Sequence, residues 1–151
     1  MKATELQIGD WVGRVFDDKR IIEDYRQVDW IRTGEIGMRY CKVWSIGCIE
    51  PIPLTPEILK KNDWYWGLTS DEEDYLSCVG GAYDEHWVYD EGAGEISLIF
   101  PKDVDGGLLK IDDQRFNRHL EFIWTDTLYV HELQHALRLC GLDELADNFK
   151  I

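Results

Sequence analysis

The chain has 151 residues, of which 44% are hydrophobic and 13% aromatic. This composition excludes a wholly disordered protein, because it supplies enough apolar side chains for a core. Thirty Asp and Glu against 16 Lys and Arg give a net charge of −14, which opposes non-specific attraction to nucleic acid or to an anionic membrane surface. The opening residues 1–11 lack the apolar stretch of a signal peptide, so we expect a cytoplasmic protein.

The negative charge is concentrated in the second part of the sequence. Residues 1–62 carry 10 acidic and 10 basic residues, whereas residues 63–151 carry 20 acidic and 6 basic ones. No Lys or Arg occurs from Asn62 to Pro101. This shift predicts an internal boundary, with parts at 1–62 and 63–151 that form either two units or one continuous domain.

The first part predicts a small, strongly bent antiparallel sheet. Residues Leu6–Val12 suit a strand that enters a turn. A short helix is expected at residues 56–62, with Thr55 as its N-cap and Pro56 as its first residue. Glycines separate the remaining β-prone runs, as in a small barrel of the Src-homology-3 type: Ile21–Ile22, Val28–Ile31 and Met38–Ile49.

The second part predicts an acidic antiparallel sheet covered by a C-terminal helix. The helix begins near Thr125 or Asp126 and ends at Cys140, where Gly141 is a natural stop. A last short element spans residues 143–151, and the expected fold class is α+β. The strand-like runs are residues 75–79, 85–89, 95–100, 107–111 and 119–124, with a hairpin turn at 91–94.

The predicted C-terminal helix contains the sequence His131-Glu132-Leu133-Gln134-His135, which is the HExxH signature of zinc peptidases. On a helix, residues i and i+4 point the same way, so His131 and His135 could hold one zinc ion. Glu132 would then act as the general base on the metal-bound water. A helical wheel places His131, His135 and Arg138 opposite an apolar stripe, which also fits an ordinary amphipathic surface helix with an exposed histidine pair.

The third zinc ligand is not identified by spacing. No His follows His135. The possible ligands are therefore carboxylates after Gly141, or an upstream histidine, and neither arrangement matches a known zinc motif. These candidates are Glu144, Asp147, His119 and His86.

Acidic and aromatic residues alternate in the part that lacks Lys and Arg. Arrays of carboxylates can imitate a nucleic-acid backbone and occupy a basic groove on a partner protein. The alternative interpretation is a solvated face whose aromatic residues turn inward. The candidate binding residues are Asp71, Glu72, Glu73, Asp74, Asp84, Glu85, Asp90, Glu91, Trp64, Trp66 and Trp87.

The four cysteines are Cys41, Cys48, Cys78 and Cys140, and they form no CxxC pair. A chain of this size with a core does not need disulfides, so we expect reduced thiols in a cytoplasm.

Three stretches together resemble a family of small proteins of unknown role, found in gut Bacteroidales genomes and in their phages and prophages. They are ELQIGDWV at 5–12, IEPIPLTPEIL at 49–59 and YVHELQHAL at 129–137. The resemblance implies a bacterial host cell and supplies no activity. In that family the ending often reads more like VHQLQN, which implies a structural helix that does not depend on Glu132 or His135.

The favoured hypothesis is a non-enzymatic accessory protein of phage or mobile-element origin. Its acidic surface would bind a host protein with a basic surface, as a nucleic-acid mimic or inhibitor, without cofactor and without direct contact with nucleic acid or membrane. Two alternatives stay open: a zinc-dependent hydrolase or peptidase that uses His131, Glu132 and His135, and a structural phage component.

Overall fold

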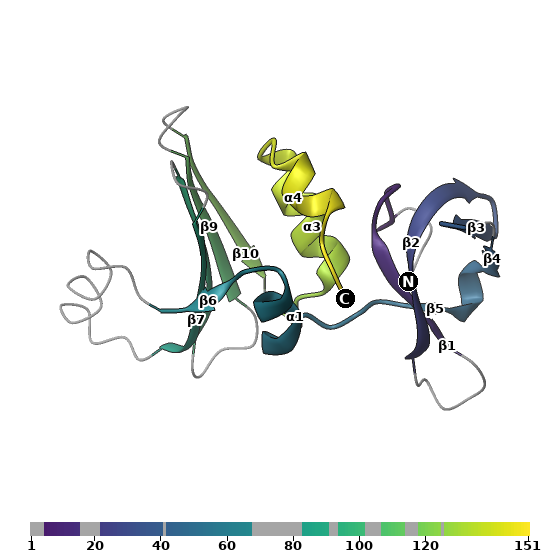
Figure 1. The fold of residues 1–151 in the computed structure, drawn as a ribbon, viewed down its shortest axis with the longest axis horizontal. Coiled ribbons are helices and arrows are strands. Elements are labelled where there is room, and N and C mark those ends of the chain that lie inside the picture. Colours follow the sequence, from purple (N-terminus) through teal and green to yellow (C-terminus); the bar gives the residue numbers. More distant parts are fainter. Residues whose placement is uncertain are drawn as a thin grey trace. The chain divides into compact units, whose positions relative to one another are not determined.

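A computed structural model describes residues 5–15, 22–40, 42–67, 83–90, 94–101, 107–113, 118–124 and 126–151 (Figure 1). The chain divides into two compact units. The first comprises Met1–Leu54 and Tyr129–Ile151, and the second comprises Thr55–Leu128. The second unit is therefore inserted between two segments of the first. This grouping differs from the expected parts 1–62 and 63–151, because the C-terminal helices group with the first sheet.

The first unit contains an antiparallel sheet of five strands in the order β4-β3-β2-β1-β5. Within the described residues, β4 pairs only with β3 and β5 pairs only with β1. The sheet is therefore open, and the predicted Src-homology-3 barrel is not confirmed. The strands are β1 (Trp11–Val15), β2 (Ile22–Arg32), β3 (Glu35–Met38), β4 (Lys42–Ser45) and β5 (Ile49–Glu50), with a 3-10 helix at Ile46–Cys48.

The first strand starts later in the chain than the predicted start at Leu6. Strand β1 begins at Trp11 because Gly9, with a φ of +92°, turns the chain just before it. The Gly9 N–H donates to the carbonyl of Val28 at 2.7 Å, which fixes this turn against β2. Among the described residues, seven buried side chains form the core of this sheet: Leu6, Val12, Val28, Ile36, Met38, Trp44 and Ile49.

Two helices, α3 (Val130–Leu139) and α4 (Asp143–Asp147), lie side by side in the first unit (Figure 1). Helix α3 begins at Val130 rather than near Asp126. The reason is that Tyr129 is extended and bridges to Pro53, while the Val130 N–H donates to the Ile52 carbonyl at 2.9 Å. The predicted helix end is confirmed, because Gly141 follows Cys140 with a φ of +76°.

The second unit contains helix α1 (Pro56–Lys61) and a second antiparallel sheet in the order β10-β9-β8-β7-β6. The predicted N-cap is confirmed, because the Thr55 hydroxyl accepts from the Ile58 N–H at 3.4 Å. The expected strand at 75–79 lies outside the described residues, as does most of the turn at 91–94, whereas the other four strands are confirmed. The strands are β6 (Tyr65–Trp66), β7 (Tyr83–Asp90), β8 (Gly94–Pro101), β9 (Gly107–Asp113) and β10 (Arg118–Trp124).

The core of the second unit forms around β8. Four consecutive residues, Ile96 to Ile99, are buried, so both faces of this strand are covered. Trp64 and Trp87 are also buried, and the Trp64 ring lies 5.9 Å from that of Tyr89. The two antiparallel sheets and the C-terminal helix confirm the expected α+β class. None of the described helices is long and apolar enough to cross a membrane.

Candidate functional site

The HExxH sequence occupies the first half of α3, and only one of its histidines lies near the surface. His131 is 5% exposed, whereas the side chain of His135 is 22% exposed. The expectation of an exposed histidine pair is therefore wrong for His131. The apolar stripe is confirmed, because Val130, Leu133 and Leu137 are fully buried. Helix α3 is covered on more than one side, and a helical wheel does not reveal that.

A buried carboxylate organises the surroundings of His135. Asp10 is fully buried just before β1, and its Oδ2 lies 2.7 Å from Nε2 of His135. The same oxygen accepts from the Gln7 N–H at 2.7 Å, while Oδ1 accepts from Nη1 of Arg138 at 2.7 Å. Arg138 also pairs with Asp147 at 3.0 Å. Burial of a carboxylate is costly unless it is paired, and these donors compensate it.

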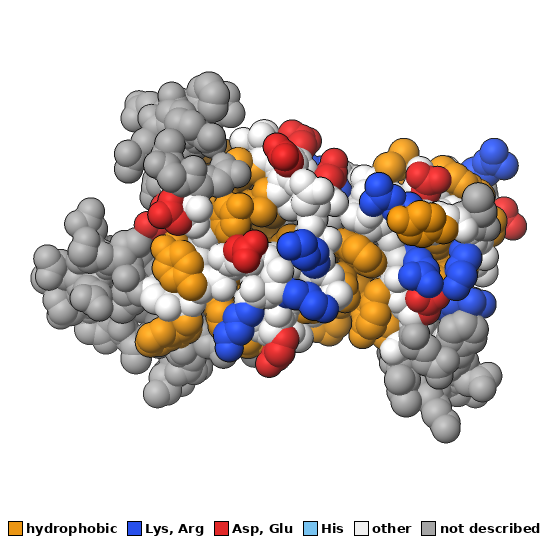
Figure 2. All heavy atoms as spheres, in the orientation of Figure 1, with side chains coloured by type: hydrophobic (Ala, Val, Ile, Leu, Met, Phe, Trp, Pro, Cys, Tyr) orange, Lys and Arg blue, Asp and Glu red, His pale blue; other side chains and the backbone are white. Residues whose placement is uncertain are grey.

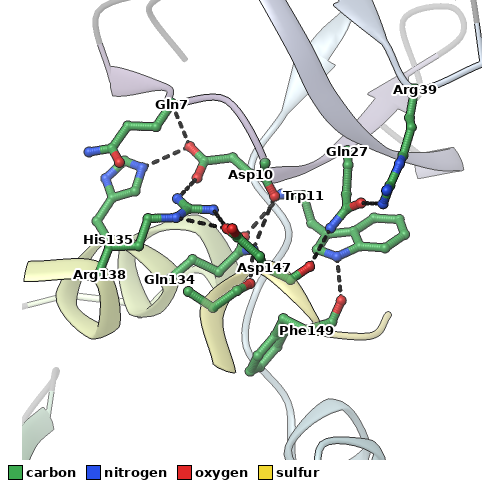
Figure 3. Close-up of polar contacts among 12 residues, drawn as sticks. Gln7, Asp10, Trp11, Gln27, Arg39, Gln134, His135, Arg138, Asp147 and Phe149 are labelled. Atoms are coloured by element: carbon green, nitrogen blue, oxygen red, sulfur yellow. Dashed lines mark hydrogen bonds and ion pairs between the residues drawn. The ribbon is translucent and has the colours of Figure 1, made fainter. Parts of the chain in front are cut away.

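Gln134 connects three segments of the first unit from a fully buried position (Figure 3). Its Oε1 accepts from the Trp11 N–H at 3.0 Å, and its Nε2 donates to the carbonyls of Gly9 at 3.2 Å and Ala146 at 2.8 Å. The Trp11 indole in turn donates to the Phe149 carbonyl at 2.6 Å. Gln134 and Asp10 thus tie the first sheet to both C-terminal helices. Neither residue was predicted, because the sequence gives no sign of which polar side chains are buried.

These contacts already engage two of the three HExxH side chains. Because a carboxylate only accepts, Nε2 of His135 carries the proton that it shares with Asp10. The Glu132 carboxylate turns back to accept from the Tyr129 N–H at 3.0 Å, so it caps the N-terminus of α3. The His131 and His135 rings meet edge to face, with centroids 5.7 Å apart.

Two of the proposed third ligands, Asp147 and His119, already have other partners. Asp147 is bonded to Arg138, and His119 pairs with Glu121 in β10. The side chain of His86 lies outside the described part. Across the described ranges, no three His, Cys, Asp or Glu side chains are placed to hold a metal ion together.

A cleft of about 420 Å³ opens beside the start of α3. His131 forms part of its wall, and its Nδ1 has no hydrogen-bond partner among the described residues. Burial lowers the pKa of His131 below its usual value, against the opposing effect of the carboxylates of Asp10, Glu132 and Glu5. The ring is therefore neutral near pH 7. The cleft is lined by Glu5, Pro51, Tyr129, His131, Glu132 and His135.

The candidate acidic surface is described only in part. Asp71 to Asp74 and Glu91 lie outside the described residues, and for Asp84 and Glu85 only the backbone in β7 is described. Asp90 is exposed at the end of β7, and Trp66 is 66% exposed. Trp64 and Trp87 are buried, so they belong to the core and present no surface to a partner.

An exposed aromatic residue that was not predicted lies next to Asp90. Tyr65 is 50% exposed in β6, and its register partner is Val88. Partial burial, together with the charges of Asp90 and Glu95, raises the pKa of Tyr65. Asp90 is paired in register with Glu95, and alternate residues of a strand share a face, so Tyr65 and these carboxylates lie on one face of the sheet. Orange hydrophobic and red acidic side chains lie near one another over this end of the sheet (Figure 2).

Comparisons with known proteins assign no relative to this chain. It matches no protein-family model, no curated protein and no solved structure. The resemblance to the Bacteroidales family therefore stays a prediction from the three sequence stretches.

Proposed function

We propose that this chain is a non-enzymatic accessory protein, of phage or mobile-element origin, that binds a basic surface of a host protein. The observation that carries the proposal is the patch of Tyr65, Asp90 and Glu95 on one face of the second sheet. An exposed aromatic ring beside two carboxylates offers both ion pairs and cation–π contacts to Lys or Arg.

The charge of the second unit supports this proposal. Residues 55–128 carry 17 acidic and 6 basic residues, while the first unit carries 13 and 10. The second unit therefore accounts for −11 of the net charge of −14. A field of this sign attracts a basic partner and accelerates the encounter.

The zinc-hydrolase alternative receives less support from the geometry. His135 and Glu132 already make hydrogen bonds to Asp10 and to the helix N-terminus. A hydrolase would have to break both contacts before these side chains could serve as ligand and general base.

The test measures binding of a fluorescent Arg/Lys-rich peptide to the full chain. We expect Tyr65→Ala and Asp90→Asn each to weaken binding several-fold, and a rise from about 0.05 to 0.5 M salt to weaken it strongly because the contacts are screened. Trp66→Ala is the matched aromatic control, since Trp66 points to the opposite face of β6. Glu144→Gln, an exposed residue of the first unit, is the matched charge control.

Two results would contradict the proposal. The first is binding that does not change with salt. The second is binding that Tyr65→Ala and Asp90→Asn weaken no more than the two controls do, which would show that this face is not used.

A further inference from the structure

Strand β10 is the longest of the described strands that end the two sheets (Figure 1). The other edge strands, β4, β5 and β6, contain four, two and two residues. Strand β10 contains seven, and its register with β9 is continuous from Arg118 to Trp124. Proteins commonly protect a sheet edge by a short strand, a proline or a bulge, because an open edge is a template for pairing with another chain. Strand β10 has none of these three protections.

The side chains of β10 are exposed on both faces of the strand. Ile123 is 77% exposed and Leu120 is 37% exposed, while Phe122 and Trp124 are partly buried. Leu120 and Ile123 lie on opposite faces, because successive residues of a strand alternate. In the described part of the chain, β10 pairs with β9 alone. An exposed apolar strand of this length is suited to receive a further strand at its outer edge.

The sequence of β10 is complementary to itself in one antiparallel register. When two copies pair about Phe122, Leu120 of one copy faces Trp124 of the other, and Glu121 faces Ile123. Residues 120, 122 and 124 share one face, so both copies contribute to a continuous apolar row. No two like charges face each other in this register. A register centred on Glu121 would instead oppose two carboxylates, which is unfavourable.

The side chains of β10 favour a second copy over a basic segment at this edge. Four of its last five residues are apolar, and the fifth, Glu121, is paired with His119 at 3.2 Å. A basic segment would place charged groups against the apolar row, whereas β10 of another copy places apolar groups there. The net charge of −14 opposes the approach of two copies. Added salt screens this repulsion, so it should strengthen the contact.

We propose that two copies of this chain pair through β10, antiparallel and centred on Phe122, so that their second sheets become one continuous sheet. This contact is independent of the proposed binding to a basic host protein. Strands β10 and β6 lie at opposite edges of the sheet. The pairing therefore leaves Tyr65 in β6 accessible, and a dimer carries this surface twice.

The test is sedimentation equilibrium of the full chain over a range of concentrations, at about 0.05 and 0.5 M salt. We expect a monomer–dimer equilibrium whose dimer is favoured at the higher salt. Binding to a basic partner has the opposite dependence on salt, so the two proposals fail separately. A chain that stays monomeric at both salt concentrations, or a dimer that weakens as salt is added, would overturn the proposal.

Two substitutions at one position test the register. Ile123→Glu should weaken the dimer about tenfold, because the new carboxylate faces Glu121 of the other copy. Ile123→Lys should retain the dimer, because the introduced ammonium faces the same carboxylate. Leu139→Glu is the matched control, since Leu139 is 75% exposed in α3 and the substitution adds the same charge. Equal effects of Ile123→Glu and Ile123→Lys, or of Ile123→Glu and Leu139→Glu, would contradict the proposed pairing.

NMR of a mixture of labelled and unlabelled chains observes the contact directly. We expect cross-peaks between the Leu120 methyl groups of one copy and the Trp124 ring of the other. A dimer without these cross-peaks would show that the copies associate through another surface, and it would overturn the assignment to β10.

Discussion

Asp10 connects two segments of the first unit that lie far apart in the sequence. It is fully buried, and it accepts from His135, Arg138 and the Gln7 backbone. We expect Asp10→Ala to lower the free energy of unfolding by about 3 kcal/mol, because it removes the buried acceptor that His135, Arg138 and the Gln7 N–H share. Chemical denaturation measures this change, with Glu144→Ala as an exposed control expected to cost no more than about 0.5 kcal/mol. A loss below about 1 kcal/mol would show that the network contributes little.

Protonation of His131 makes the stability of the folded state depend on pH. Burial lowers the pKa of His131 in the folded state below its ordinary value of about 6.5. At a pH below about 6.5, the unfolded chain therefore binds a proton on this ring more readily than the folded chain does. The folded state therefore loses stability as the pH falls from about 6.5 toward the lowered pKa of His131. Above about pH 6.5 the neutral His131 ring contributes fully to the stability.

The pH prediction is tested by thermal melts between about pH 7.5 and 5.5. We expect the wild-type chain to lose more stability over this interval than His131→Gln, whose side chain does not titrate. His119→Gln, an exposed control in the second unit, should behave like the wild type. The same slope in the wild type and in His131→Gln would contradict the assignment.

In helix α3, the glutamate of the HExxH sequence caps the N-terminus of the helix. Glu132 is the third residue of the helix, and its carboxylate accepts from the backbone of Tyr129. We expect Glu132→Ala to destabilise the chain by about 1 kcal/mol, because an N-terminal cap is lost. Glu132→Gln should retain most of this stability, since an amide oxygen accepts the same hydrogen bond. Equal destabilisation by both variants would exclude a capping role.

Much of the element order follows from local sequence signals. Thr55-Pro56-Glu57 specified a helix start, and Gly141 specified a helix end, because each signal acts within one turn. The sequence misplaced the start of α3, which is fixed by the contacts of Tyr129 and Val130 with Pro53 and Ile52, far away along the chain. The sequence also missed Asp10 and Gln134, because burial of a polar side chain depends on partners that only the fold assembles.

The division of the whole molecule into two units does not coincide with the boundary that the charge predicted. The sequence indicated a boundary near residue 62, whereas the units join at Leu54 and Tyr129. The charge is uneven between these units too, because the inserted unit carries most of the net negative charge. The grouping of α3 with the first sheet could not be predicted, because it depends on hydrogen bonds between residues such as Trp11 and Gln134, which are 123 positions apart.

The metal content of the purified, untagged chain tests whether the HExxH sequence binds zinc. We expect less than stoichiometric zinc after incubation with the metal, because His135 and Glu132 are engaged by Asp10 and by the helix N-terminus. His131→Ala should bind the same amount as the wild type. About one zinc per chain, lost in His131→Ala, would favour the hydrolase instead.

The insertion of one unit into the other sets the order in which the protein can be completed during synthesis. Residues 55–128 leave the ribosome before any of Tyr129–Ile151, so the acidic sheet has all its strands while the first sheet still lacks both of its helices. Asp10 is made before residues 55–128, whereas its partners His135 and Arg138 are made after them. The contacts of Asp10 with His135 and Arg138 can therefore form only after the whole inserted unit has been synthesised.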